Sequence, residues 1–400
     1  MKKIIICILS LILLFCGCSV PSSEKNSKDE PVNAVYVKSA WITYFELEKL
    51  TTNSNTEKDF EKAAKTAFKG VKSNGFNTVT VQVRPCADAF YKSDYFPVSK
   101  YCFGVQGCEL KYDPLAVMVN IAHDLGLRIE AWINPYRVSQ SPEIEELSDN
   151  NIAKQWYGSE DKKTNVYIDD KIYFNPASAE VQELIVNGVK EIVKNYAVDA
   201  IHFDDYFYPS TKEDVDKESY AAYVKNGGKL KLEDWRRENV SAMVKAVYSA
   251  IKEINASVEF GISPQSKISA NYNNLYADVE RWATEEGFVD YICPQIYFGF
   301  YNESQPFTKT AKDWAELVTS CRLYVGLALY KSGQEDKFAS ADKDYAINEF
   351  KENHNIISRQ ISYLKQLENV NGFYIFSYSY LNDKENASVA EEVKNIKSVI

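Results

Sequence analysis

Apolar segments of two different periods alternate along almost the whole of this 400-residue chain. Short apolar, β-branched runs fit buried strands, and the longer stretches between them space apolar residues three to four positions apart, as amphipathic helices do. The expected strands are 35–42, 77–83, 128–133, 199–204, 259–263, 291–296, 323–329 and 372–377. The expected helices are 57–73, 114–125, 178–195, 235–254, 276–286, 308–319, 356–367 and 387–398.

Eight strands, each followed by a helix, predict an α/β fold of the (β/α)8 TIM-barrel type. Two long connections, at about 85–113 and 207–234, follow the second and fourth expected strands. Both fall on the side of the barrel where βα loops build a binding cleft. We see no internal repeat and expect one domain over 33–400. The alternative is a barrel that closes earlier and carries a small C-terminal cap.

The N-terminal residues have the pattern of an export segment followed by a tether. Lys2 and Lys3 precede an apolar run, 4–15, that is too short to span a bilayer. The motif Phe15-Cys16-Gly17-Cys18 resembles the lipobox of bacterial lipoproteins, although Leu is usual where Phe15 stands. We therefore expect a lipoprotein signal peptide over 1–17, lipidation of Cys18 and a disordered tether over 18–32. The domain would lie outside the cytoplasm, anchored to the membrane of the cell envelope; a plain secretory signal is the alternative.

Charge and missing motifs argue against several classes of protein. The formal net charge is −10 and no Lys/Arg-rich block is present, which argues against a nucleic-acid partner. The chain has no G-x-G-x-x-G after a strand, no Walker loop, no G-x-S-x-G and no H-E-x-x-H. With only three His and no C-x-x-C spacing, we expect neither a cofactor nor a metal. Export permits disulfides, and Cys102 and Cys108 flank a short loop where they could pair.

The fourth expected strand ends in two adjacent carboxylates, Asp204 and Asp205, among aromatic residues. The carboxyl ends of barrel strands carry the chemistry in this fold. Neighbours on a regular strand face opposite sides, so we expect one aspartate at the barrel mouth and the other turned outward or re-aimed by the loop. His202 shares the face of Asp204 and could hold or tune it. The structural alternatives are an aspartate pair on a surface turn and a histidine satisfied in the barrel core.

The ends of the other expected strands add side chains that suit a sugar. Aromatic faces cover the C–H surface of a sugar, and amides and guanidinium groups bind its hydroxyls. Trp41 and Trp132 are the expected stacking platforms. The other expected substrate-binding residues are Arg84, Asn134, Arg137, Gln295, Tyr297, Tyr330 and Tyr378.

Cleavage of a glycosidic bond needs a proton donor and a second group at the anomeric carbon. Two side chains adjacent in sequence would struggle to reach opposite sides of one bond. We therefore expect the second group to come from the substrate or from another carboxylate. The candidates are Glu130, Glu303, Asp88 and Asp113, of which Glu130 also fits a buried structural acid.

Several motifs, in order, resemble the bacterial glycosyl-hydrolase-like family ten. The similarity runs from about residue 35 to at least residue 330, and its motifs are Ala40-Trp41-Ile42, Gly75-Phe76-Asn77-Thr78-Val79, Gln82-Val83-Arg84, Tyr112-Asp113-Pro114-Leu115, Ala131-Trp132-Ile133-Asn134-Pro135-Tyr136-Arg137, Asn175-Pro176, His202-Phe203-Asp204-Asp205-Tyr206-Phe207-Tyr208-Pro209, Gly261-Ile262-Ser263-Pro264, Trp282, Pro294-Gln295-Ile296-Tyr297 and Gly326-Leu327.

The resemblance implies a (β/α)8 barrel on a surface lipoprotein that acts on cell-wall glycan, with Asp204 or Asp205 as the general acid. Some members of the family are thought to hydrolyse peptidoglycan strands stripped of their peptides. The fourth strand is also faintly similar to that of family-eighteen chitinases, but Tyr206 stands where those enzymes have their acidic Glu.

The sequence therefore predicts a lipid-anchored glycoside hydrolase of an N-acetylhexosamine-containing polysaccharide, above all peptidoglycan glycan strands. One alternative is a non-catalytic glycan-binding lipoprotein with a degenerate barrel site. Another is a lyase-type or transglycosylating enzyme on the same substrate.

Overall fold

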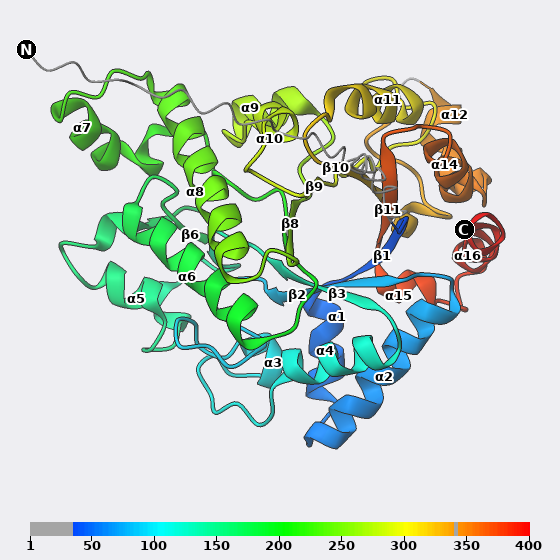
Figure 1. The fold of residues 1–400 in the computed structure, drawn as a ribbon, viewed down its shortest axis with the longest axis horizontal. Coiled ribbons are helices and arrows are strands. Elements are labelled where there is room, and N and C mark those ends of the chain that lie inside the picture. The colour runs from blue at the N-terminus through cyan, green and yellow to red at the C-terminus, as the bar shows by residue number, and fades with distance from the viewer. Residues whose placement is uncertain (1–34, 340–342) are drawn as a thin grey trace, which may run out of the picture. The chain divides into compact units, whose positions relative to one another are not determined.

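Eight parallel strands form a closed barrel at the centre of the computed structural model, which describes residues 35–339 and 343–400 (Figure 1). The strands are β1 (Val37–Ile42), β2 (Thr78–Arg84), β3 (Arg128–Ile133), β7 (Ala200–Phe203), β8 (Glu259–Ile262), β9 (Tyr291–Ile292), β10 (Arg322–Ala328) and β11 (Val370–Phe376). Their order around the barrel is β1-β11-β10-β9-β8-β7-β3-β2. Because β11 pairs with β1, the last strand closes the barrel, and the alternative with an early closure is wrong.

Amphipathic helices surround the strands and confirm the predicted (β/α)8 fold (Figure 1). They are α2 (Glu57–Ser73), α4 (Pro114–Asp124), α6 (Ala179–Asn195), α8 (Leu232–Ile254), α10 (Val279–Thr284), α11 (Phe307–Leu317), α14 (Ile356–Leu364) and α16 (Ala387–Val399). Two of these helices begin at residues that cap them. The side chain of Thr56 accepts a hydrogen bond from the backbone N–H of Asp59 at the start of α2, and the side chain of Asp113 accepts one from the backbone N–H of Ala116 at the start of α4. Residues 36–400 form one compact unit.

The sixth barrel strand is shorter than the sequence indicated. We expected 291–296, but β9 ends at Ile292. Pro294 has no N–H for a ladder bond, so regular pairing cannot continue through it. Gln295 then forms isolated bridges with Gln265 and Gly326, which keeps the segment at the barrel mouth.

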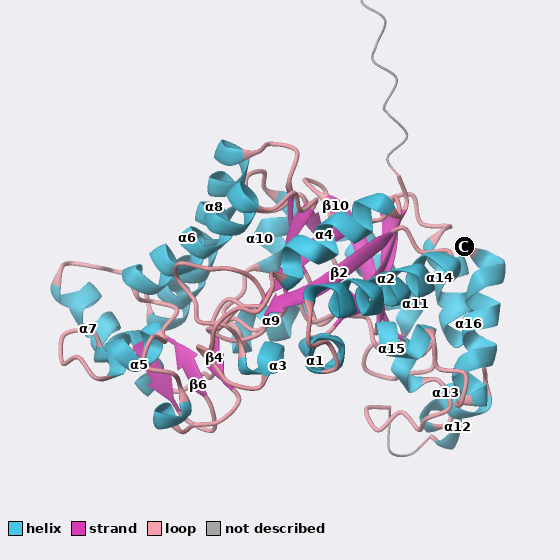
Figure 2. Ribbon diagram, turned by 90° about the horizontal axis from the view of Figure 1, so that it is seen from below, coloured by secondary structure: helices cyan, strands magenta, loops and turns pink. Residues whose placement is uncertain are grey.

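The connections that follow the strands carry most of the extra structure, and Figure 2 shows them gathered on one side of the barrel. The expected long connections hold α3 (Lys100–Phe103) after β2, and η3 (Glu213–Val215) with α7 (Lys217–Lys225) after β7. Shorter additions are α1 (Tyr44–Thr52), α9 (Ile268–Asn274), η4 (Leu329–Lys331), α12 (Asp344–Ile347), α13 (Glu349–Glu352) and α15 (Tyr378–Leu381).

A third long connection, between β3 and α6, was not predicted. It contains η1 (Ile144–Glu146), α5 (Ile152–Tyr157), η2 (Lys163–Asn165) and a three-stranded antiparallel sheet of β4 (Arg137–Ser139), β5 (Val166–Ile168) and β6 (Ile172–Phe174). Strands of three residues are too short for an alternating pattern to stand out in a sequence.

Two apolar clusters form the core. The larger one fills the layer between the sheet and the helices, and the smaller one lies inside the barrel around Trp41, Trp132, Tyr291 and Tyr374. These rings are large for a barrel interior, and Gly261 makes room for one of them. A Cβ on Gly261 would lie 2.0 Å from the ring of Tyr291.

The structure bears differently on the predictions for the N-terminus and on the prediction for the cysteines. The signal peptide, Cys18 and the tether lie outside the described residues, which contain no helix long and apolar enough to cross a membrane. The suggested bridge is not formed, because Cys102 and Cys108 are both free thiols in the structure.

Candidate active site

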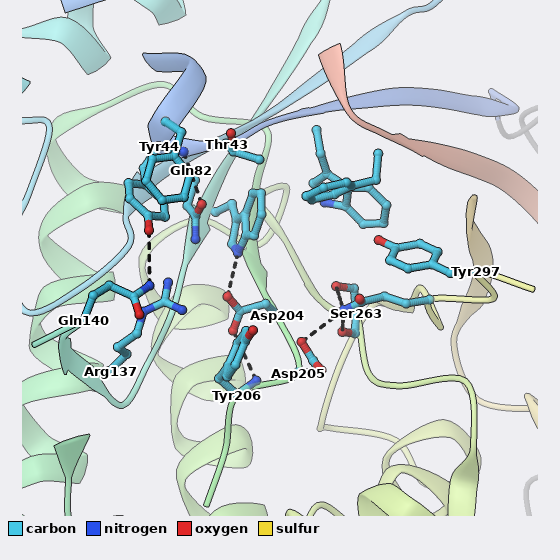
Figure 3. Close-up of a pocket in the computed structure, with 15 residues that line it drawn as sticks. Thr43, Tyr44, Gln82, Arg137, Gln140, Asp204, Asp205, Tyr206, Ser263 and Tyr297 are labelled. Carbon is cyan, nitrogen blue, oxygen red and sulfur yellow. Dashed lines mark hydrogen bonds between the residues drawn. The ribbon is translucent and has the colours of Figure 1, made fainter. Parts of the chain in front are cut away.

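A cavity of about 260 Å³ opens at the carboxyl ends of the barrel strands (Figure 3). It has aromatic, amide and charged walls. The lining residues are Trp41, Thr43, Tyr44, Phe45, Gln82, Trp132, Arg137, Gln140, Asp204, Asp205, Tyr206, Ser263, Gln295, Tyr297 and Phe376.

Asp204 is 3% exposed and is held by three donors. Trp132 Nε1 donates to its Oδ2 at 3.1 Å, Asn134 Nδ2 lies 3.1 Å from both carboxyl oxygens, and the backbone N–H of Tyr206 donates to Oδ1 at 3.3 Å. Asn134 is itself fixed, because its Oδ1 accepts a bond from the backbone of Arg137. Asn134 does not line the cavity and acts by orienting Asp204.

Burial raises the pKa of Asp204 to about 7. The negative charge of Asp205 acts in the same direction, while the nearby Arg137 and the donated hydrogen bonds oppose it. A carboxyl with this pKa holds a proton for about half of the time at neutral pH and can both release and take up a proton there.

Asp205 also lines the cavity, although neighbours on a regular strand would face opposite ways. Strand β7 ends at Phe203, so neither aspartate follows the strand alternation. Gln295 Nε2 donates to Asp205 Oδ1 at 3.2 Å, and the same nitrogen bonds the backbone oxygen of Ser263 at 2.9 Å. Asp205 is less buried than Asp204; burial raises its pKa, and the bond from Gln295 lowers it.

Arg137 and two tyrosines form the wall on the side of Asp204 (Figure 3). Arg137 Nε donates to the backbone oxygen of Pro85 at 2.9 Å, and its guanidinium lies 5.1 Å from the ring centre of Tyr206. Tyr44 Oη accepts a bond from Gln140 Nε2 at 3.1 Å. On the opposite side Tyr297 and Phe376 supply aromatic surface, with their ring centres 6.1 Å apart.

His202 lies below the cavity and not on its wall. Its Nε2 accepts a bond from Trp41 Nε1 at 3.2 Å, so Nδ1 carries the proton and donates to Tyr291 Oη at 3.0 Å. Burial lowers the pKa of His202 to about 3. Both nitrogens are used and the ring is neutral, which matches the barrel-core alternative. The one ring proton is donated to Tyr291 and does not face the cavity.

Of the expected sugar-binding residues, Trp41, Trp132, Arg137, Gln295 and Tyr297 meet at the cavity. Trp41 and Trp132 expose little of their rings and use their indole N–H groups to fix His202 and Asp204. Tyr330 lines a neighbouring cavity, and Tyr378 on α15 lines neither.

Arg84 points out of the barrel, and its expected role in sugar binding is not supported by this position. A register shift between Gln82 and Arg84 inserts one residue, so Gln82 reaches the cavity while Arg84 turns toward α6. There its guanidinium stacks on Phe96 at 4.4 Å beside Gly188.

The four candidates for a second carboxylate do not line the cavity. Glu130 is fully buried in the barrel and accepts bonds from the hydroxyls of Thr80, Tyr291 and Tyr374. Asp113 caps α4, Asp88 is buried and bonded by Gln106, and Glu303 pairs with Lys343. Among the described residues, Asp204 and Asp205 are therefore the carboxylates of the cavity.

Several lining residues were not among the predicted site residues. Tyr44, Gln82 and Ser263 follow or end the expected strands, and that position in the sequence is the signal that places them at the barrel mouth. Gln140 comes from the unpredicted connection after β3, and nothing in the sequence places it near Tyr44.

A known family and two named relatives match this chain over most of its length. The family model described as glycosyl hydrolase-like 10 matches residues 37–347. The chain belongs to the glycosyl hydrolase-like 10 family. Glycosyl hydrolase YngK of Bacillus subtilis strain 168 is 33% identical over 406 residues, covering 95% of this chain and 74% of YngK. Glycosyl hydrolase DigH of Escherichia coli K12 is 34% identical over 339 residues, covering 77% of this chain and 73% of DigH.

Solved glycoside hydrolases share the fold of this family member. The glycoside hydrolase domain of PgaB (BpsB) from Bordetella bronchiseptica superposes with a TM-score of 0.57 at 10% identity, covering 91% of this chain and 98% of that domain. The α-L-fucosidase isoenzyme 2 from Paenibacillus thiaminolyticus superposes with a TM-score of 0.55 at 12% identity, covering 91% of this chain and 49% of the fucosidase chain. The family supports a glycosidase, and the solved structures show the shared fold.

Proposed function

We propose that this protein is a glycoside hydrolase that cleaves an N-acetylhexosamine-containing cell-wall glycan, above all peptidoglycan strands. The observation that carries the proposal is the adjacent pair Asp204 and Asp205 at the barrel mouth, in a cavity with aromatic and amide walls. The family and the fold of its neighbours support the class of reaction.

Asp204 is the general acid in this proposal. Each oxygen of a neutral carboxyl can accept bonds while one of them carries the proton. Three donors hold Asp204 at the wall of the cavity, where its carboxyl faces a bound substrate. Repulsion from Asp205 favours keeping one of the two carboxyls protonated.

The acetamido group of the substrate is the nucleophile, because the described cavity offers no carboxylate besides the adjacent pair. First, the Asp204 proton moves to the glycosidic oxygen as its bond to the anomeric carbon breaks and the acetamido carbonyl oxygen bonds that carbon. Asp205, oriented by the bond from Gln295, accepts a hydrogen bond from the acetamido N–H, whose proton stays on the nitrogen. Then Asp204 takes a proton from water while the water oxygen displaces the acetamido oxygen, so the product gains one water and retains its configuration.

Product mass tests the proposal. Purified protein is incubated with peptide-free peptidoglycan strands, with and without removal of the N-acetyl groups. We expect fragments that carry one added water from the acetylated strands alone. The variants Asp204→Asn and Asp205→Asn should each lose at least about 100-fold in rate. Asp124→Asn, an exposed carboxylate at the end of α4, is the matched control.

The other outcomes each contradict a part of the proposal. Fragments that lack the water would indicate a lyase-type enzyme. Intact strands that still retard on the wild-type protein would indicate a glycan-binding protein. Equal cleavage of de-N-acetylated strands would exclude the acetamido nucleophile.

A further inference from the structure

Asp205 is bonded by glutamines from the ends of two neighbouring barrel strands. Gln295, after β9, donates from Nε2 to Asp205 Oδ1 at 3.2 Å and to the backbone oxygen of Ser263 at 2.9 Å, which uses both hydrogens of that nitrogen. The side-chain amide of Gln265, after β8, also bonds Asp205. Gln265 and Gln295 form an isolated parallel bridge, and residues paired in this way point to the same side. The two amides therefore reach Asp205 from adjacent positions.

A side chain on α9 fixes the backbone of Gln265. Because β8 ends at Ile262, Gln265 lies beyond the regular ladder, and its N–H and C=O need other partners. Asn271 supplies both. Its Oδ1 accepts from the N–H of Gln265 at 3.1 Å, and its Nδ2 donates to the backbone oxygen of Gln265 at 2.7 Å. One planar amide thus holds both backbone groups of a single residue, which fixes the direction in which the side chain of Gln265 leaves the chain.

Asn271 is itself held in place and lies away from the substrate. Its side chain is fully buried, and its Nδ2 also bonds the backbone oxygen of Lys267 at 3.1 Å. Its own backbone oxygen accepts from the N–H of Ala277 at 2.9 Å. Asn271 lines neither the active-site cavity nor the neighbouring cavity to which Tyr330 belongs. Any effect of Asn271 on the chemistry must therefore pass through Gln265.

The bonds to Asp205 act against its burial. Burial raises the pKa of Asp205, and the bonds from Gln295, from its own backbone N–H and from Gln265 lower it, in this order of size. A bond donated to a carboxylate favours its charged form, which is the stronger acceptor. The charged and titratable groups that face Asp205 are Asp204, Arg137, Tyr206 and Tyr297.

We propose that Gln265 and Asn271 are positioning residues of the active site: Asn271 fixes the backbone of Gln265, and the amide of Gln265 holds the Asp205 carboxylate in place for the substrate. The inference rests on the proposed function, in which Asp205 accepts a bond from the acetamido N–H, and it adds two residues to that site. Because the two residues act in series, loss of either should have the same consequence for Asp205, and loss of both should add nothing.

The experiment measures the pKa of Asp205 from the carbon-13 signal of its carboxyl group. All proteins carry Asp204→Asn, so that one carboxyl of the adjacent pair titrates, and Asp205→Asn identifies the signal. Gln265→Met and Asn271→Ala should each raise the pKa of Asp205 by about 0.5–1 unit, because a donor to its charged form is lost or displaced. The double variant should raise it no further than Gln265→Met, because both changes remove the same bond.

A matched control and a kinetic measurement separate positioning from stability. Asn395 on α16 also donates from Nδ2 to a backbone oxygen, that of His354 at 2.7 Å, and Asn395→Ala should leave the pKa of Asp205 unchanged. With Asp204 restored, the acidic limb of kcat/KM on glycan strands should move to higher pH in Gln265→Met and in Asn271→Ala. A residue that only stabilises the fold would lower the rate at every pH without moving this limb.

Two results would overturn the inference: a pKa that Asn271→Ala leaves unchanged, or shifts that add in the double variant. If Asn271→Ala does not fold, Asn271→Ser keeps a shorter donor and acceptor and should give a smaller shift in the same direction, and no shift would again reject the role of Asn271. The titration needs no substrate. A wild type that cleaves no glycan would therefore contradict the proposed function, while the titration still decides whether Asn271 acts on Asp205 through Gln265.

Discussion

Two opposing influences act on the proton of Asp204. Burial raises its pKa to about 7, whereas the bonds from Trp132 and Tyr206 and the charge of Arg137 lower it. Loss of water around a carboxyl disfavours its charged form, and here this increase in the pKa exceeds the decrease caused by the hydrogen-bond donors and by Arg137. The result is a buried acid that is correctly oriented and can still release its proton near neutral pH.

This balance predicts how activity depends on pH. A general acid must be protonated in the free enzyme, so kcat/KM should fall as pH rises through about 7, where Asp204 loses its proton. An aryl N-acetylhexosaminide with a good leaving group needs no proton, and its alkaline limb should be much shallower. Rates between pH 5 and pH 9 on a glycan strand and on the aryl substrate test this. Equal alkaline limbs on both substrates, in the wild type and in Asp124→Asn, would argue against Asp204 as the acid.

At the scale of single residues, the sequence indicated the acid pair but not the orientation of its neighbours. Asp204 and Asp205 stand out because two carboxylates follow a buried strand among aromatic residues. Arg84 could not be placed, because a register shift of one residue turns it from the cavity to the helix layer. A shift of this kind depends on the partner strand and leaves no local signal.

At the scale of elements, the strand ends were predictable and the connections were not. Eight apolar runs predict eight strands, and their carboxyl ends meet at one mouth because parallel strands share a direction. The connection after β3 has no long periodic segment, yet it supplies Gln140 and Arg137 to the cavity. Its position depends on packing against the β2 connection, as in the bond from Arg137 to Pro85.

The barrel interior gives a prediction at the same scale. Tyr291 is fully buried, and its hydroxyl bonds both His202 and Glu130. Because a Cβ on Gly261 would lie 2.0 Å from this ring, Gly261→Ala forces the ring to move. We expect a loss of about 1–3 kcal/mol in the free energy of unfolding, measured with urea.

The matched control for this substitution is Gly158→Ala at the end of α5. There the closest atom to a new Cβ is a backbone oxygen at 3.5 Å, an ordinary contact. The free energy of unfolding of Gly158→Ala should stay within about 0.5 kcal/mol of the wild-type value. If the two alanine variants are equally stable, close packing around Tyr291 does not explain the glycine at 261.

At the scale of the whole molecule, buried carboxyls and the net charge act on stability in the same direction. Burial raises the pKa of Asp204 to about 7 and that of Asp88 to about 6, against about 4 in an unfolded chain. Their contribution to stability is complete below the unfolded pKa and is lost as pH rises through the folded pKa. The net charge of −10 adds self-repulsion as carboxyls ionise.

Burial lowers the pKa of His202 to about 3, so its effect is opposite: stability rises by about 2 kcal/mol between pH 5 and the unfolded pKa of about 6.5. The two acids outweigh it at about 1.4 kcal/mol for each unit of pKa shift, and we expect the free energy of unfolding to fall by about 1–3 kcal/mol from pH 5 to pH 8. Asp169 and Glu335 have lowered pKa values, but they sit in exposed ion pairs that contribute little and whose effect is lost only at more acidic pH. Urea unfolding at the two pH values measures the difference. Asp88→Asn should reduce it, because an amide at this position does not titrate, and Asp124→Asn should not. A protein that is more stable at pH 8 than at pH 5 would show that groups such as the buried neutral His202, and not the buried acids, dominate its response to pH.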